Sequence, residues 1–211
     1  MEVGTAVVMY ADTNAIDVLR AAPILDRSAT LALVHRLFSA SDVVEIGDAL
    51  LSDAVNPAED VVYVGCFPGL DVICGWQLVT DRPSTATERI LAGAARPTAY
   101  LHAMHTVVDW CAFGLWTDGT LGRAVSVSSG AGVVEDIGER LSFEEPYWAG
   151  ARTDGRDDAG THPLPFRPVE LATAALHAFF GFRLDGGEGI DDVDPEIIPV
   201  VGYRVTPPAR A

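Results

Sequence analysis

Residue types that could do chemistry are concentrated in one segment, HAMHTVVDWCAFGLW, at positions 102 to 116. It holds two histidines, an aspartate and a cysteine in an otherwise apolar run, with no proline and no glycine before Gly114. These residue types suit a Cys-His-Asp arrangement for nucleophilic catalysis, or a His-His-Asp set for metal binding. Which arrangement can form depends on the secondary structure of the segment.

The β-branched and aromatic residues of this segment predict a strand. On a strand His102 and His105 point to opposite faces and cannot share an ion. His105 is also six extended residues from Cys111, about 20 Å, which is far beyond hydrogen-bond reach unless the chain reverses near Thr106. A helix would instead align both histidines with Asp109, which is the alternative that favours a metal. From the strand interpretation we expect no metal and no cofactor.

The register of the segment follows from Asp118-Gly119, the residue pair typical of a two-residue type I′ hairpin turn. Strand alternation then places Cys111 opposite Ser126, and Asp109 opposite Ser128. These four residues would share one end of one face. They form either a hydrogen-bonded edge of the core, or half of a site that is completed across the sheet. The candidate pocket residues are His102, His105, Asp109, Cys111, Ser126, Ser128 and Asp71.

The charge of the chain limits its partners. The sequence has 14 basic and 30 acidic residues, a formal net charge of -16, and every basic residue is an arginine. Because that field repels phosphate groups and no local basic patch offsets it, we expect neither nucleic acid nor an anionic membrane as a partner. The absence of lysine excludes phosphate-binding loops of the GxxxxGK[ST] type and Schiff-base lysines.

The remaining composition is that of a globular protein. The 211 residues, 49% of them hydrophobic, are enough for a core without disulfides, and we expect a single domain over residues 1–211. The three cysteines contain no CxxC pair, which indicates buried thiols in a reducing compartment. The first residues lack a basic segment, and no apolar run is long enough to span a membrane. We therefore expect a cytoplasmic location.

The pattern of elements predicts an α+β fold. We expect a mixed or mainly antiparallel sheet of six or seven strands with three or four packed helices. An α/β fold is the alternative, because helices follow the first strand. Strands are predicted at 3–11, 61–67 and 71–79, around the 118–119 turn and at the C-terminal end. Helices are predicted through Arg20, after the Asp26 cap, through about Ala94 and at 168–180. Two acidic loops, at 151–163 and 185–196, do not fit the calcium-binding loop pattern.

Several distinctive motifs extend over nearly the whole chain: CFPGLDV, the DRP before the middle helix, LHAMHTVVDW, FEEPYWAG and PLPFRPVELATAALHAFFGF. Together these motifs resemble a family of uncharacterised bacterial proteins from GC-rich, actinomycete-type genomes. The family is a domain of unknown function. The resemblance implies a bacterial, cytoplasmic protein and assigns no catalytic residue.

Two functions are open from the sequence. The first is a non-catalytic binding or interaction protein for a basic protein partner, which is motivated by the acidity and by the lack of a geometrically consistent active site. The alternative is a small-molecule hydrolase or transferase. Its site would join Asp109, Ser126 or Cys111 with Asp71 or His105 from other strands.

Overall fold

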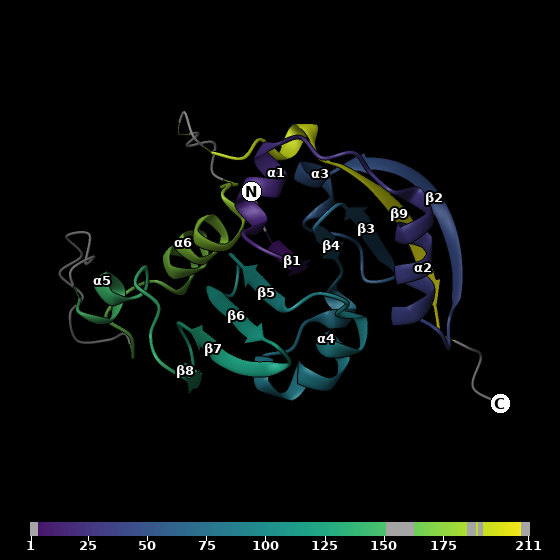
Figure 1. Ribbon diagram of the computed structural model, residues 1–211. Helices are drawn as coiled ribbons and strands as arrows, with labels where there is room; N and C mark the ends of the chain where they lie inside the picture. The colour runs from purple at the N-terminus through teal and green to yellow at the C-terminus, as the bar shows by residue number, and fades with distance from the viewer. Residues whose placement is uncertain (1–3, 151–162, 185–188, 190–191, 208–211) are drawn as a thin grey trace.

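One nine-stranded sheet organises the chain, in the order β2-β9-β3-β4-β1-β5-β6-β7-β8 (Figure 1). This computed structural model describes residues 4–150, 163–184, 189 and 192–207. The strands are β1 (Gly4–Ala11), β2 (Asp42–Leu50), β3 (Val61–Phe67), β4 (Leu70–Cys74), β5 (Thr98–His105), β6 (Trp110–Thr117), β7 (Thr120–Ser128), β8 (Gly132–Ile137) and β9 (Pro199–Thr206). Every neighbouring pair of strands is antiparallel. The sheet therefore has the antiparallel architecture expected of the α+β class, and none of the parallel pairing of the α/β alternative.

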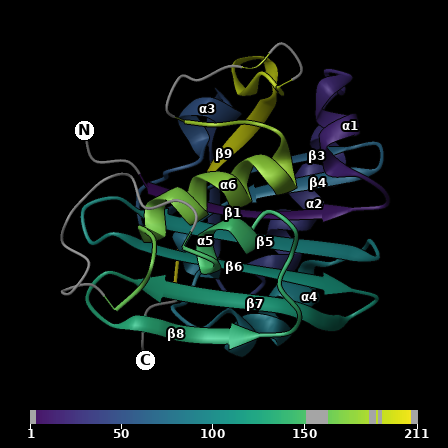
Figure 2. The same cartoon turned by 90° about the vertical axis from the view of Figure 1, so that its left-hand side faces the viewer.

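Helices cover both faces of the sheet (Figures 1 and 2). The α-helices are α1 (Ala15–Arg20), α2 (Arg27–Leu37), α3 (Leu51–Ala54), α4 (Thr87–Gly93), α5 (Glu145–Trp148) and α6 (Pro168–Phe180), and the 3-10 helices are η1 (Trp76–Leu78), η2 (Pro83–Ala86) and η3 (Pro195–Ile197). Residues of α1, α3, α5 and α6 pack into the core on one face, where α6 lies over β5 and β6. Residues of α2, η1 and α4 pack into a second core on the other face. We call these the α6 face and the α2 face.

Local sequence explains where several elements begin and end. Pro168 opens α6, and Gly181, with φ of 78°, ends it in the left-handed conformation that glycine adopts without strain. The side chains of Asn14 and Asp26 accept hydrogen bonds from the first turns of α1 and α2. Gly69, with φ of 84°, makes the turn that joins β3 to β4. These boundaries were predicted from the sequence.

Other predictions need correction. The sheet has nine strands, not six or seven, because β2 and β8 were not predicted. The described part of the chain also has six α-helices, more than the three or four expected, since α3 and α5 are single turns of four residues. The strand predicted at 71–79 ends at Cys74, where 3-10 helix η1 follows. Most of the two acidic loops lies outside the described residues.

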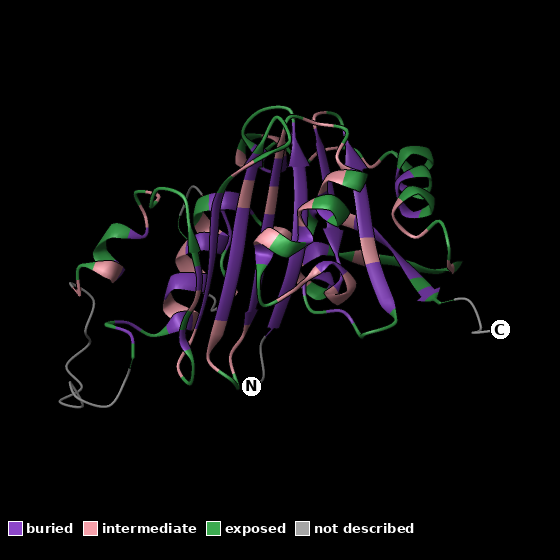
Figure 3. Ribbon diagram, turned by 90° about the horizontal axis from the view of Figure 1, so that it is seen from below, coloured by how far each residue is buried: buried purple, intermediate pink, exposed green. Residues whose placement is uncertain are grey.

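Burial decreases from the middle of the sheet toward β2 (Figure 3). All eight residues of β1 are buried, whereas no residue of β2 is fully buried. No helix in the described ranges is long and apolar enough to cross a membrane.

Candidate functional site

His102 is a structural residue of the core. Its Nδ1 lies 2.9 Å from Thr5 Oγ1 and its Nε2 lies 2.8 Å from the carbonyl oxygen of Ala172 in α6. Because a carbonyl only accepts, Nε2 carries the proton and Nδ1 accepts from the threonine hydroxyl. Complete burial lowers the pKa of His102 to about 4. The neutral imidazole therefore ties α6 to the sheet and does not face solvent.

His105 does not join His102 in a site. It ends β5 opposite Gly4, three residues along an extended strand from His102, and its ring centroid lies 6.4 Å from that of Trp76. The strand over 98–105 confirms the prediction that the two histidines point to opposite faces. Among the described residues, no group of three or more His, Cys, Asp and Glu side chains could hold a metal ion.

The prediction of one extended strand through Cys111 is wrong, because β5 ends at His105 and the chain reverses at residues 106–109. His105 therefore pairs with Trp110. Cys111 pairs with Met104 and is not about 20 Å from His105, although it lies in the core on the opposite face from His105.

Asp109 links two turns to the start of α6. It has φ of 46° in the turn between β5 and β6. One carboxylate oxygen accepts a hydrogen bond from the N–H of Val169 at 3.1 Å, and the other accepts from the hydroxyl of Ser129. The Arg167 guanidinium lies 3.8 Å away. These contacts are those of a helix-capping residue.

The predicted register of the β6–β7 hairpin is wrong beyond Trp116. Trp116 does face Leu121, but the next pair is Leu115 with Arg123, so Gly122 is an extra residue in β7. A bulge of one residue moves every later side chain to the other face. The Asp-Gly turn was read correctly, and the pairs predicted further along the hairpin were all displaced by one residue.

The bulge separates the residues that the predicted register had placed on one face. Cys111 faces Val127 and is buried in the core on the α6 face, where burial raises the pKa of its thiol. Ser126 faces Ala112 and accepts a hydrogen bond from Trp110 Nε1 at 3.2 Å. The expected polar face of these residues is therefore not assembled.

The other two candidate residues also have local partners. Ser128 Oγ accepts a hydrogen bond from the N–H of Ala131, at 3.0 Å, in the turn before β8. Asp71 accepts two hydrogen bonds from Arg96, at 2.9 Å and 3.1 Å. Arg96 also donates to Asp12 and to the carbonyl of Phe67. This network joins the ends of β1, β3 and β4 to Arg96, two residues before β5.

A cleft of about 720 Å³ opens beside this network, between the start of α2 and the β3–β4 turn. Cys66 lines it, and burial together with the neighbouring Asp71 raises the pKa of the Cys66 thiol to about 12. The thiol is therefore protonated near neutral pH and is a poor nucleophile. The Arg96 guanidinium in the cleft wall already donates to two carboxylates. The cleft offers no activated group for a nucleophilic reaction.

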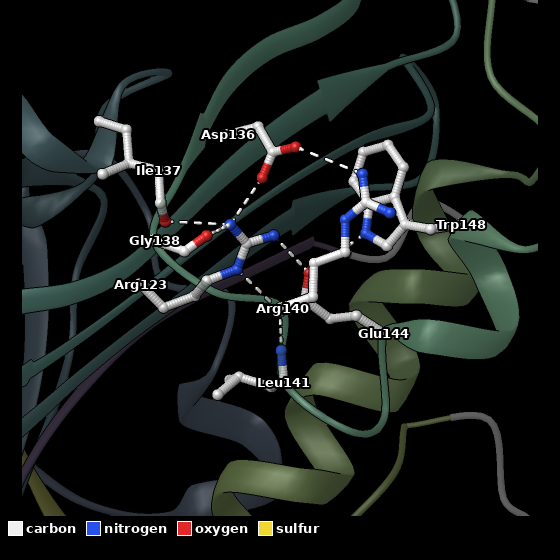
Figure 4. Close-up of polar contacts among 8 residues, drawn as sticks. All are labelled: Arg123, Asp136, Ile137, Gly138, Arg140, Leu141, Glu144 and Trp148. Atoms are coloured by element: carbon white, nitrogen blue, oxygen red, sulfur yellow. Dashed lines mark hydrogen bonds and ion pairs between the residues drawn. The ribbon is translucent and has the colours of Figure 1, made fainter.

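Sequence reasoning missed a buried ionic cluster around Arg123 (Figure 4). This guanidinium donates to both carboxylate oxygens of Glu144, to Asp136 and to the carbonyls of Ile137 and Gly138. The Arg123 side chain is 1% exposed and that of Glu144 is 0% exposed. A cation that is fully enclosed by protein acceptors holds β7, β8 and α5 together, and it is closed to a ligand.

Glu144 is buried although the neighbouring Glu145 is exposed, and the position of α5 explains the difference. The two oxygens of Glu144 also accept hydrogen bonds from the N–H of Leu141 and from Trp148 Nε1. Arg140 lies over the Trp148 ring, 4.3 Å from its centroid, and closes the outer side of the cluster (Figure 4). In the sequence, the one indication that Glu144 is buried was the pair of aromatic residues, Tyr147 and Trp148, that follows the two glutamates.

One of the two terminal strands of the sheet, β2, is exposed along its length, and we call it the β2 edge (Asp42–Leu50). This nine-residue strand pairs with β9 on one side, and the described sheet has no strand on the other side. Val44 is 61% exposed and Ile46 is 42% exposed. An exposed strand of this length with apolar side chains is a template for pairing with another chain. The β2 edge is therefore the candidate functional site.

Acidic side chains line the β2 edge. Asp42, Glu45 and Asp48 are all exposed, and the last two form ion pairs with Arg27 at the start of α2. Glu45 and Asp48 remain 50% and 63% exposed. Two carboxylates thus share one arginine and Asp42 adds a third negative charge, which leaves negative potential beside the unpaired backbone groups.

The chain matches a known protein family over most of its length. Residues 5–203 match the family of unknown function DUF6928. The chain belongs to this family. Because the match includes nearly all of the described sheet, the β2 edge and the buried clusters are parts of the DUF6928 domain itself. Neither the curated proteins nor the solved structures contain a match.

Proposed function

We propose that this DUF6928 protein is a non-catalytic binding protein for a basic protein partner, and that it binds this partner at the β2 edge. The single observation that carries the proposal is the unpaired terminal strand with three exposed carboxylates, on a chain of formal net charge -16. Opposite charge accelerates association and selects the partner. Exposed apolar side chains beside the carboxylates supply area to bury.

Self-association at this edge is disfavoured by the same charge. Two β2 strands paired edge to edge would bring two rows of carboxylates together, on two chains that each carry a formal charge of -16. Like charges that face each other across paired strands are destabilising. The same carboxylates that repel a second copy attract a basic partner. Charge complementarity therefore favours a basic partner over a dimer.

The alternative function, a small-molecule hydrolase or transferase, has less support. Its proposed residues Asp109, Cys111 and Ser126 have separate structural partners, and two of them lie on opposite faces of the sheet. The cleft beside Asp71 contains a thiol whose pKa is raised. In none of these places does a nucleophile lie beside a base, as such chemistry requires.

We further propose a bacterial, cytoplasmic setting. Cys66, Cys74 and Cys111 are all buried free thiols, which suits a reducing compartment. The partner is then a basic protein of the same compartment. Fractionation of the native cells with an antibody against the protein tests this, and recovery in the culture medium would contradict it.

A titration with a defined probe tests the function. The probe is an eight-residue peptide of alternating arginine and valine, and its control has glutamate in place of arginine. Calorimetry at low and at physiological salt should show that the basic peptide binds and that its affinity falls as salt rises, because the attraction between exposed charges is screened. The acidic peptide should not bind. Absence of binding by the basic peptide at low salt, or equal binding of both peptides, would overturn the proposal.

A further inference from the structure

The backbone groups of β2 divide into a set that faces β9 and a set that faces away from the sheet. The N–H of Val205 donates to the carbonyl just before β3, at 2.8 Å, so Val205 points away from β2. Its neighbour Arg204, opposite Val44, therefore points toward β2. By the same alternation Val44 faces β9, whereas the N–H and C=O groups of Val43 and Glu45 face outward.

The same division holds beyond the bulge in β2. The N–H of Leu51 donates to the carbonyl of Ile198, at 2.9 Å, on the side of β9. Ala49 has the same orientation, so the backbone groups of Asp48 and Leu50 face outward. In the described sheet no strand lies on that side. The β2 edge thus presents outward hydrogen-bonding groups on both sides of its bulge.

The side chains of β2 also divide by chemistry. Glu45 and Asp48 lie on the α2 face, because both contact Arg27 of α2. Ile46 lies on the α6 face beside Tyr63, since a Cβ built on Gly202 would meet Ile46 Cγ1 at 2.9 Å and Tyr63 Cε1 at 2.8 Å. Around the bulge the α2 face of the edge is therefore acidic and the α6 face is apolar. Asp42, at the start of the strand, lies on the α6 face with Val44 by alternation.

We infer that the basic partner binds as an extended segment that adds a tenth strand to the sheet at the β2 edge. This inference rests on the proposed function. Strand addition would pair the outward backbone groups of β2, and an alternating sequence matches the two faces. Arginine or lysine side chains of the segment face Glu45 and Asp48, and β-branched side chains lie beside Ile46. The partner class is thus a protein with an exposed strand or tail of alternating basic and β-branched residues.

A change in the peptide separates strand addition from simple charge attraction. The arginine-valine peptide is compared with the same peptide carrying N-methyl groups on its four central amides, which keeps every charge and side chain but removes the donors. Strand addition predicts at least a tenfold weaker affinity for the methylated peptide. Equal affinities would overturn strand addition and leave the proposed function standing. If neither peptide binds, both fail.

A change in the protein tests the location. Val43→Pro removes an outward donor and leaves the β2–β9 hydrogen bonds intact, since proline is tolerated at sheet edges. Val43→Ala is the matched control, because it removes side-chain contacts and keeps the donor. The proline variant should lose at least fivefold in affinity relative to the alanine variant at equal thermal stability. Equal affinities would overturn strand addition here.

Amide exchange gives a readout that does not depend on any variant. Addition of the unmethylated peptide should slow hydrogen exchange at the outward amides of Val43, Glu45 and Asp48. The amide of Val44 already faces β9 and should change little. Protection that is absent from β2, or uniform along it, would contradict an added strand.

Discussion

Arg123 and Glu144 form an ion pair with two hydrogen bonds inside the molecule, Nε to Oε1 at 2.9 Å and Nη2 to Oε2 at 2.5 Å. The arginine directly follows Gly122, the bulge residue of β7. The pair thus fixes α5 against the part of the sheet that sequence reasoning placed in the wrong register. Its energetic role can be measured.

Replacing one partner of this pair should be costly. Arg123→Met leaves the fully buried Glu144 without its cation, and such a change costs roughly 3–5 kcal/mol of unfolding free energy. The double variant Arg123→Met with Glu144→Met removes both charges and should recover part of that loss. Urea unfolding measures the free energy of unfolding of the single and the double variant. A single variant that loses less than about 1 kcal/mol would show that the pair is not the anchor of α5.

His102 should make the stability fall in acid. Its folded-state pKa is about 4, below the ordinary 6.5, so protonation favours the unfolded state. The stability due to the neutral imidazole is complete above about pH 6.5 and is lost as the pH falls toward 4, by roughly 3 kcal/mol in all. The difference in unfolding free energy between wild type and His102→Asn should shrink over this window. A constant difference would contradict the assignment.

Two glycines in the left-handed conformation offer a matched comparison of backbone strain and steric conflict. Gly119 has φ of 77° with open space around it, whereas a Cβ on Gly138, with φ of 83°, would lie 1.9 Å from the carbonyl oxygen of Gly122. Gly119→Ala should cost about 1 kcal/mol from conformation alone. Gly138→Ala should cost several times more, because two backbone segments must separate. Thermal melting checks the ranking, and equal losses would contradict it.

Asp109 should behave as a cap and not as a catalytic group. Asp109→Ala removes the acceptor for Val169 N–H and should cost about 1–2 kcal/mol. Asp118→Ala is the control, since Asp118 has a similar φ of 48° in an exposed turn. A larger loss at Asp109 supports capping. Unchanged stability of Asp109→Ala would count against it.

Local signals in the sequence predicted much of the fold. The Pro168 start and Gly181 stop of α6, the caps Asn14 and Asp26 and the Asp118-Gly119 turn each depend on neighbouring residues, so the sequence alone reveals them. No comparable local pattern predicts that Gly122 is an extra residue in β7. Because side chains alternate along a strand, this one residue displaced Ser126 and Ser128 relative to β6. The turn at residues 106–109, which was not predicted either, removed Asp109 from the strand.

The candidate site itself was missed for a different reason. In β2 the apolar residues Val43, Val44 and Ile46 do not alternate cleanly with polar ones, because the strand is exposed on both faces and has a bulge. Only the position of β2 at the end of the sheet reveals its unpaired edge, and strand order depends on contacts between residues far apart in the chain. The net charge indicated the class of partner but not the surface.

The central claim is that a basic partner binds at the β2 edge, and charge reversal tests it most directly. The affinity of the arginine-valine peptide is measured for the double variant Glu45→Arg with Asp48→Arg, and for the control Glu139→Arg with Glu145→Arg. The control reverses two exposed carboxylates beyond the opposite end of the sheet. Both variants change the net charge equally. We predict at least a tenfold weaker affinity for the β2 variant than for the control. Equal affinities for the two variants would contradict the claim.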